Sequence, residues 1–249
     1  MHHFFVKPEQ ISGTEAYIEG PDWNHAANVL RVRPGEQVLL SAGEDWDYLC
    51  TVTELDRASQ RVLLKVTEEN LDVRELPVRI TLYQGLPKSD KMELIIQKAV
   101  ELGAARIVPV ETARCVVKLD RKKAEAKQKR WQSISESAAK QSGRSIIPEV
   151  AMPLSYGAAL QEAASADVRL IPYENAEGME RTRRILSEVR PGQSIAVFIG
   201  PEGGFEEKEI SLAEEQSFSA VTLGKRILRT ETAGFVMLSL LMAQTEGKK

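Results

Sequence analysis

Two short segments near the C-terminus combine glycines, charges and apolar side chains in a way that suits a binding cavity. The first, Ile199–Phe205, holds three glycines, a proline and a glutamate directly after an apolar run. The second, Leu223–Ala233, follows another apolar run and holds a glycine, three basic residues and a glutamate. Ligands of open parallel sheets bind outside the carboxyl ends of the strands. We therefore expect the two segments to line one pocket.

The first segment offers a stiff array of backbone groups. Proline restricts the turn, and glycine lets the backbone approach a ligand closely, so N–H and C=O groups are presented in fixed directions that suit the edge of an adenine. A helix expected from about Glu206 offers its N-terminus to an anion. The glycine order is neither Gly-x-Gly-x-x-Gly nor a Walker loop, which removes the usual support for a dinucleotide or a nucleoside triphosphate. A plain turn is the alternative.

The second segment supplies apolar walls and charge. Two aliphatic residues stand beside basic ones, and the guanidinium of Arg229 can stabilise negative charge on a bound group. Glu231 lies in the first turn of the helix that follows, where a carboxylate is favourable. Thr230 or Thr232 can cap that helix, and capping alone is the alternative explanation for these three residues.

The elements that would position these loops alternate between strand and helix from residue 78 onward. This alternation of strands and helices indicates an α/β fold, in which helices cover a parallel sheet. One helix shows an apolar face from Met92 to Leu102, with Asp90 able to cap its start and Gly103 its end. The C-terminal helix is apolar nearly all round and predicts burial in the core or against another subunit. We expect strands at 78–83, 106–110, 168–173, 194–199 and 220–223, and further helices at 121–142, 178–189 and 233–242.

Residues 1–72 have a different pattern. Short apolar runs at 37–41, 48–53 and 61–66 indicate strands of a small β-barrel. A short helix is expected at 22–30, and the polar stretch 68–77 is expected to be a linker. We therefore predict two domains, 1–72 and 73–249.

Charge is unevenly distributed along the chain. Residues 76–147 carry 15 Lys/Arg and 7 Asp/Glu, whereas residues 1–75 carry 7 and 14. A basic middle third can concentrate positive potential where phosphates would lie. A solvated helix face without a partner is the alternative for residues 121–130.

Composition argues against several other classes. The two cysteines, Cys50 and Cys115, are far apart, which fits a reducing cytoplasm better than a disulfide framework. The chain start lacks the pattern of a signal peptide, and no apolar run is long enough to cross a membrane. His2, His3 and His25 do not form a metal-ligand pattern, so we expect no metal.

The two C-terminal segments resemble the cofactor loops of the SPOUT methyltransferases. They are most similar to the bacterial branch that methylates N3 of a uridine in small-subunit (16S) ribosomal RNA. The resemblance extends upstream through residues 97–103, 141–144 and 29–31, and it therefore covers nearly the whole chain. It implies a deep trefoil knot at the two strand ends, S-adenosylmethionine as cofactor, a PUA-like N-terminal barrel that binds RNA, and a homodimer. The residues it implies for the cofactor are Ile199, Gly200, Pro201, Glu202, Gly203, Leu223, Gly224, Ile227, Leu228 and Thr232.

The resemblance also suggests roles in catalysis and RNA binding. Arg229 and Glu231 are the candidate catalytic residues, with Glu202 as a second candidate to accept a proton or meet the sulfonium charge. A structural ion pair between Arg229 and a nearby carboxylate is the alternative. Lys140 departs from the family, which has an acidic residue there, and the N-terminal part is acidic although the family uses it to grip RNA. The candidate RNA contacts are Arg31, Arg33, Lys88, Lys98, Arg114, Arg130 and Arg144.

Two other functions are compatible with the sequence. One is a SPOUT enzyme that methylates the ribose 2′-oxygen. The other is a ribosome-assembly factor that binds RNA without chemistry. If the protein methylates uridine N3, the expected partner is small-subunit rRNA, either naked or within an assembled subunit.

Overall fold

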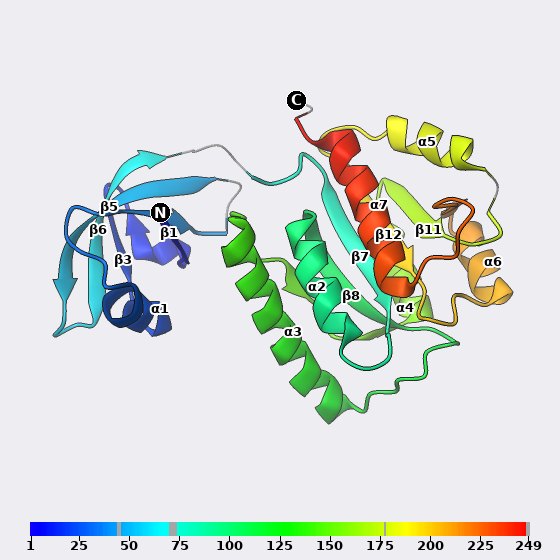
Figure 1. The fold of residues 1–249 in the computed structure, drawn as a ribbon, viewed down its shortest axis with the longest axis horizontal. Coiled ribbons are helices and arrows are strands. Elements are labelled where there is room, and N and C mark those ends of the chain that lie inside the picture. Colours follow the sequence, from blue (N-terminus) through cyan, green and yellow to red (C-terminus); the bar gives the residue numbers. More distant parts are fainter. Residues whose placement is uncertain (44–45, 70–73, 177, 248–249) are drawn as a thin grey trace. The chain divides into compact units, whose positions relative to one another are not determined.

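The computed structural model describes residues 1–249 except 44–45, 70–73, 177 and 248–249. The chain divides into two compact units. Unit 1 comprises Met1–Glu75 and Ala139–Ile147, and unit 2 comprises Leu76–Ala138 and Pro148–Lys249. The predicted boundary between residues 72 and 73 lies outside the described residues. Each unit has its own sheet (Figure 1).

Unit 1 is built on a six-stranded sheet with the order β1-β4-β5-β6-β3-β2. The first pair, β1 and β4, is parallel, and the other neighbours are antiparallel. Alternate side chains of these strands, such as Phe4, Leu40 and Val62, form its core. The strands are β1 (His2–Phe5), β2 (Ile11–Ser12), β3 (Glu15–Ile18), β4 (Gln37–Ser41), β5 (Asp47–Asp56) and β6 (Arg61–Glu69).

The short helix expected at 22–30 is more irregular than a simple pattern predicts. A single α-helical turn, α1 (Pro21–Asn24), continues as a π-helix over His25–Leu30. The π-helix ends at Arg31, whose φ of 56° lies in the left-handed region. Apolar periodicity cannot distinguish these helix types here, because a π-helix of six residues is little more than one turn and is too short to show a period of its own.

Unit 2 contains a seven-stranded sheet in which every pairing is parallel. The order is β10-β8-β7-β12-β11-β13, and β9 also pairs with β8. All the carboxyl ends therefore meet at one edge, which is where ligands bind in such sheets. The strands are β7 (Arg79–Gly85), β8 (Ala104–Glu111), β9 (Glu149–Val150), β10 (Leu154–Ser155), β11 (Val168–Pro172), β12 (Ser194–Ile199) and β13 (Ser219–Val221).

Helices cover both faces of this sheet. On one face α7 packs against β12 and α2 (Figure 1), and on the other the apolar sides of α4 and α6 enclose the aromatic residues of the central strands. Phe198 of β12 stacks on Tyr83 of β7 at 4.4 Å between ring centroids. The helices are α2 (Lys91–Glu101), α3 (Arg121–Ser142), α4 (Tyr156–Ala163), α5 (Met179–Ser187), α6 (Glu207–Glu215) and α7 (Thr230–Thr245).

Local signals set several helix ends. Asp120 accepts a hydrogen bond from the Lys123 backbone N–H (2.9 Å) at the start of α3. Gly103, with φ of 88°, follows the last turn of α2, as predicted. Asp90 precedes α2, but its side chain makes no capping hydrogen bond. Among the described residues, no helix is both long and apolar enough to cross a membrane.

Candidate active site

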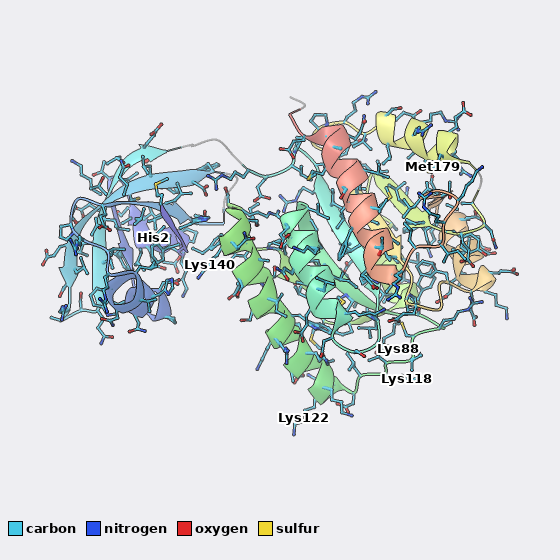
Figure 2. The ribbon with its side chains drawn as sticks, viewed as in Figure 1. His2, Lys88, Lys118, Lys122, Lys140 and Met179 are labelled. Atoms are coloured by element: carbon cyan, nitrogen blue, oxygen red, sulfur yellow. The ribbon has the colours of Figure 1, made fainter. Side chains whose placement is uncertain are left out.

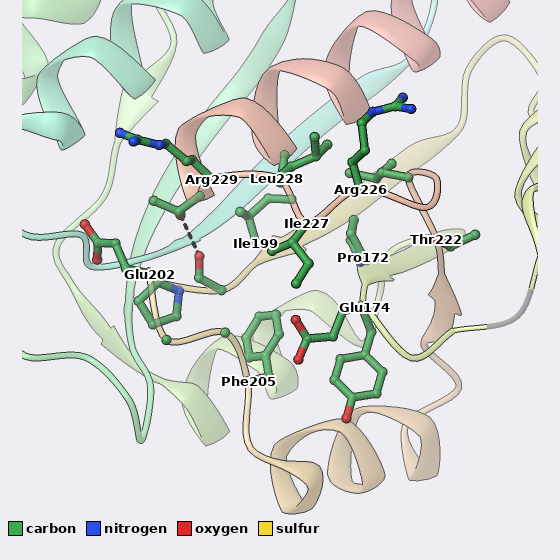
Figure 3. Close-up of a pocket in the computed structure, with 18 of the residues that line it drawn as sticks. Pro172, Glu174, Ile199, Glu202, Phe205, Thr222, Arg226, Ile227, Leu228 and Arg229 are labelled. Carbon is green, nitrogen blue, oxygen red and sulfur yellow. Dashed lines mark hydrogen bonds between the residues drawn. The ribbon is translucent and has the colours of Figure 1, made fainter.

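Three neighbouring strands of unit 2 end at one cavity. The loops after β12, β11 and β13 surround a space of about 460 Å³ (Figure 3). The two predicted segments therefore do meet, and β11, which lies between their strands, adds a third wall. The lining residues are Lys91, Pro172, Tyr173, Glu174, Ile199, Gly200, Pro201, Glu202, Gly203, Gly204, Phe205, Thr222, Leu223, Gly224, Arg226, Ile227, Leu228, Arg229, Thr230 and Ala233.

The loop after β12 is a tight turn. The Gly204 backbone N–H donates to the Pro201 carbonyl at 2.9 Å, and Gly204 has a φ of 66°. A Cβ on Gly200 would lie 3.1 Å from the Gly204 carbonyl carbon, a tight contact, and Gly204 has a left-handed backbone conformation, so glycine is favoured at both positions. Phe205 then anchors the loop in the core, with its ring 5.9 Å from that of Tyr156.

The loop after β13 is held by a buried threonine from a neighbouring helix. The Thr182 hydroxyl of α5 donates to the Thr222 carbonyl at 2.9 Å and accepts from the Thr222 N–H at 3.2 Å. Beyond Gly224, whose φ is 115°, Ile227 stands 85% exposed at the cavity rim. An aliphatic side chain this exposed beside a cavity is available to cover a bound ligand.

Thr230 does not cap α7, and neither does Thr232. Arg229 holds the capping position, and no side chain caps the helix. The Thr230 hydroxyl instead donates to the Gly200 carbonyl at 2.6 Å (dashed in Figure 3). It therefore joins the two loops across the cavity, so the capping prediction was wrong for a reason that only the tertiary structure reveals.

A lysine that the sequence did not single out sits between two of the candidate carboxylates. The Lys91 Nζ lies 3.3 Å from both Glu202 Oε1 and Glu231 Oε2. Burial alone would raise the pKa of Glu202, but hydrogen bonds from backbone N–H groups, including that of Lys88, and from Lys91 outweigh it and lower the pKa. Burial would likewise lower the pKa of Lys91, but its two carboxylate partners raise it. Both groups are therefore charged at neutral pH.

Three charged side chains that line the cavity, Arg226, Arg229 and Glu174, form no salt bridge within the described part of the chain. Within the described part of the chain, Arg229 forms no ion pair, so the alternative of a structural pair with a nearby carboxylate is not observed. Glu174, from the loop after β11, points its carboxylate into the cavity (Figure 3) and has no cationic partner among the described residues. Glu174 belongs to no motif that the sequence displays. The available signal was its place just beyond a strand that ends at the same sheet edge.

The predicted cofactor residues gather at this cavity with one exception. All of them line it except Thr232, which lies half-buried in the first turn of α7. Of the two catalytic candidates, Arg229 lines the cavity, and Glu231 reaches it only through Lys91. The site could therefore be predicted from residue types that follow the ends of strands. No sequence motif indicated that the loop after β11 and the start of α2 would also add residues to it.

The predicted RNA-contacting cations are in several different environments. Lys98 pairs with Glu101 (2.6 Å), Arg130 pairs with Glu93 (2.8 Å), and Arg114 donates to the Gly203 carbonyl (2.8 Å). The side chains of three others are exposed. These are Arg31, Arg33 and Lys88.

Arg144 differs from the other predicted RNA contacts. It is 4% exposed and pairs with Glu75 inside unit 1, and Glu75 also accepts from the Ser145 backbone N–H (3.0 Å). The charge of Arg144 is thus neutralised within the unit rather than offered to RNA, which corrects its predicted role. The described residues contain no cluster of histidine, cysteine and carboxylate side chains that could hold a metal ion.

Comparisons with known proteins agree with this geometry. The family model for an RNA methyltransferase domain matches residues 74–242, and one for an RNA methyltransferase PUA domain matches residues 18–59. Ribosomal RNA small subunit methyltransferase E of Bacillus subtilis is 36% identical, over 99% of this chain and 98% of its own. The protein of that name from Mycobacterium tuberculosis is 33% identical, over 94% and 88%.

The solved structure of one such relative is also similar to the structure of this chain. Ribosomal RNA small subunit methyltransferase E from Neisseria gonorrhoeae, bound to S-adenosyl methionine, superimposes with a TM-score of 0.82 at 36% identity, over 98% of this chain and 97% of that one. The match covers both units, and the cavity described above lies within the part matched by the methyltransferase model. The chain therefore belongs to the RNA methyltransferase family, among the relatives named ribosomal RNA small subunit methyltransferase E.

Proposed function

We propose that this protein transfers a methyl group from S-adenosylmethionine to N3 of a uridine in small-subunit ribosomal RNA. The observation that carries the proposal is the cavity at the ends of β12 and β13, where a glycine-rich turn and an apolar, cation-bearing loop face each other. The full-length similarity to proteins named for small-subunit rRNA methylation supports it.

The cavity has the properties that S-adenosylmethionine requires. Its volume of about 460 Å³ lies within the range of small-molecule sites, about 300–1,000 Å³. Apolar side chains such as Ile199 and Leu228 suit the adenine and the methionine chain, and the Glu174 carboxylate suits the positive sulfonium or ammonium group. Backbone groups of Gly200 to Gly203 provide directed polar contacts. When bound, the cofactor supplies an electrophilic methyl group.

We assign Arg229 to the stabilisation of negative charge on the uracil base of the substrate. Uridine N3 is protonated at neutral pH and becomes a good nucleophile only as that proton leaves. Negative charge then spreads onto the two carbonyl oxygens that flank N3. An unpaired guanidinium at the cavity rim can donate to such an oxygen and stabilise this charge. The N3 lone pair would then form the bond to the methyl carbon as the bond between that carbon and the sulfonium sulfur breaks, which would release S-adenosylhomocysteine.

The proton acceptor is assigned to Glu231, with Glu202 as the weaker candidate. The lowered pKa of Glu202 makes it a poor base at neutral pH. Lys91 sits between the two carboxylates, so it fixes their positions and offsets their mutual repulsion. Proton transfer through Glu231 thus requires the substrate to approach beside Lys91.

Three features of the architecture follow from the same assignment. The segments after β12 and β13 would thread as a SPOUT-type trefoil knot, and the unit 1 sheet would close as a PUA-like barrel. The second face of α7, which includes the partly exposed Phe235, Val236 and Leu240, would pack against a second copy in a homodimer. With a ribosomal substrate and few cysteines, we expect the protein to act in the cytoplasm.

RNA would be gripped by cations of both units. In unit 1, Arg31 and Arg33 are exposed on either side of the buried Val32, and they would supply positive charge despite the acidic composition. In unit 2, exposed lysines gather near the start of α3, where Lys118 and Lys122 lie away from the sheet (Figure 2). Arg114 and Lys88, beside the cofactor loop, would meet the RNA near the target base.

The decisive experiment is transfer of labelled methyl from S-adenosylmethionine to ribosomal RNA from cells that lack this protein. Naked small-subunit rRNA and assembled small subunits would be compared, followed by digestion and mass spectrometry. A single N3-methyluridine supports the proposal and identifies the substrate form. Label on a ribose 2′-oxygen would assign a different SPOUT reaction. RNA binding without any transfer would assign a non-catalytic assembly role.

A further inference from the structure

A buried glutamine lies beneath the first cofactor loop without lining the cavity. Gln84, near the end of β7, is 0% exposed and pairs in register with Ile199, the residue before Gly200. The next residue, Gly85, is so close to the loop that a Cβ there would lie 2.7 Å from the Pro201 nitrogen. The end of β7 is therefore the floor on which the glycine-rich turn rests.

A directed chain of hydrogen bonds runs from this glutamine to the turn. The Gln84 Nε2 donates to the Thr230 Oγ1 at 2.8 Å and to the Gly85 carbonyl at 3.0 Å. The Thr230 hydroxyl donates its single hydrogen to the Gly200 carbonyl at 2.6 Å. Because a carbonyl can only accept, the hydroxyl must accept from Gln84, and the direction of the whole chain is fixed.

The same partners fix the orientation of the amide. With the amide flipped, Oε1 would face the Gly85 carbonyl, and the Thr230 hydroxyl would have no hydrogen left to give it. In the observed orientation Oε1 is buried without a hydrogen-bond partner among the described residues. An unsatisfied buried oxygen is costly. The fold thus keeps an imperfectly satisfied glutamine where an apolar residue would pack without that cost.

We propose that Gln84 and Thr230 are positioning residues that aim the Gly200 carbonyl at the adenine amino group of the cofactor. A carbonyl oxygen has two lone pairs, and Thr230 occupies one of them. The other is left for a donor in the cavity that Gly200 lines. Among the neutral donors of S-adenosylmethionine, the adenine amino group matches a rigid backbone acceptor in a glycine-rich turn. The inference rests on the proposed function, because it takes this cavity as the cofactor site.

Binding of two ligands to the full chain tests the proposal. S-Adenosylhomocysteine carries the amino group, and S-inosylhomocysteine has an oxygen in its place. Calorimetric Kd values would be measured for the wild type, Gln84→Met, Thr230→Val and Thr230→Ser. Gln84→Met keeps the length of the side chain without a donor, and Thr230→Val keeps the shape without the hydroxyl. We expect the first two variants to weaken adenosyl binding about tenfold, the inosyl compound to be affected much less, and Thr230→Ser to remain within about threefold of wild type.

Thr245→Val provides a matched control. Thr245 is on the same helix, 1% exposed, and its hydroxyl donates to the Leu241 carbonyl (2.8 Å) away from the cavity. It should lower the melting temperature and leave both Kd values unchanged. Equal weakening of both ligands by Gln84→Met, or unchanged adenosyl binding, overturns the proposal while the cofactor assignment stands. If the wild type binds neither compound, the cofactor assignment itself fails, and this inference fails with it.

Discussion

Arg229 is a cation at the cavity rim that no carboxylate of the described chain neutralises. If its guanidinium acts on the uracil carbonyls as charge develops, Arg229→Ala should lower kcat by about 10²–10³-fold and change the Kd for S-adenosylmethionine less than threefold. Single-turnover kinetics and calorimetry measure the two quantities separately. Arg226→Ala, at the same rim, serves as the control and should retain most of the turnover. Parallel losses of affinity and rate in Arg229→Ala would instead indicate a contact with the cofactor.

Glu174 offers a negative charge to the cavity where a positively charged sulfonium is expected. Glu174→Gln should weaken S-adenosylmethionine about fivefold, because a partly exposed charge pair contributes about 1 kcal/mol. S-Adenosylhomocysteine lacks the sulfonium charge and should bind the variant as it binds the wild type. Glu215→Gln, an exposed change at the end of α6, should alter neither affinity. Equal weakening of both ligands would assign Glu174 to a group that both ligands carry, either the ammonium group or the ribose hydroxyls.

Individual residues of the site could be predicted from the sequence where they belong to a distinctive motif. The glycine-rich turn and the segment after β13 were located because unusual residue types follow apolar strands. Gln84, Lys91 and Glu174 were missed, because their roles depend on which strand ends lie next to each other in the sheet. Thr230 and Arg144 were misjudged for the same reason, since the partners that define them are 30 and 69 residues away.

At the scale of elements, the periodic segments were predicted closely. The bounds of α3 and β12 agree with the sequence pattern, and α2 presents the expected apolar face. The short strands β9 and β10 were not predicted, because two residues cannot show a period. The eight-residue helix α4 was not predicted either. The strand order was also beyond reach, since it follows from how helices cross over the sheet rather than from any local pattern.

The contact between β7 and the turn after β12 yields a prediction about elements. Gly85→Ala would push a Cβ into the Pro201 backbone, so the turn must shift or β7 must move away. We expect the variant to lose about tenfold or more in S-adenosylmethionine affinity and about 1–3 kcal/mol of stability, as for other overpacked sites. Calorimetry and thermal unfolding measure these changes.

Gly157→Ala is the matched control for that variant. Gly157 lies in α4, and a Cβ added there would meet no other atom within 4 Å. Alanine should leave cofactor binding unchanged and stabilise the helix by up to about 1 kcal/mol. If Gly85→Ala binds the cofactor as well as Gly157→Ala does, the turn does not depend on the close approach of β7.

At the scale of the whole molecule, the chain divides differently from a simple cut along the sequence. Residues 139–147 belong with unit 1, where Arg144 pairs with Glu75 and Lys140 pairs with Asp22 at 3.1 Å. The lysine that departs from the family pattern therefore has a partner in α1. A composition change along the chain cannot reveal this grouping, because segments far apart in sequence create it through long-range contacts.

The charge distribution of the whole chain leads to the last prediction. The excess of positive charge lies at residues 76–147, and exposed lysines on α3 such as Lys122 and Lys129 are free to contact phosphates without touching the cavity. The double variant Lys122→Ala/Lys129→Ala should weaken small-subunit rRNA binding and reduce the slope of log K against log salt by about 1–2, because each phosphate contact releases counterions. S-Adenosylmethionine affinity should not change. Lys208→Ala, which removes an exposed lysine from the acidic helix α6, should leave the slope unaltered. A double variant with the wild-type slope would mean that the basic face of α3 is simply solvated, and that RNA is held by the cations around the cavity and by unit 1.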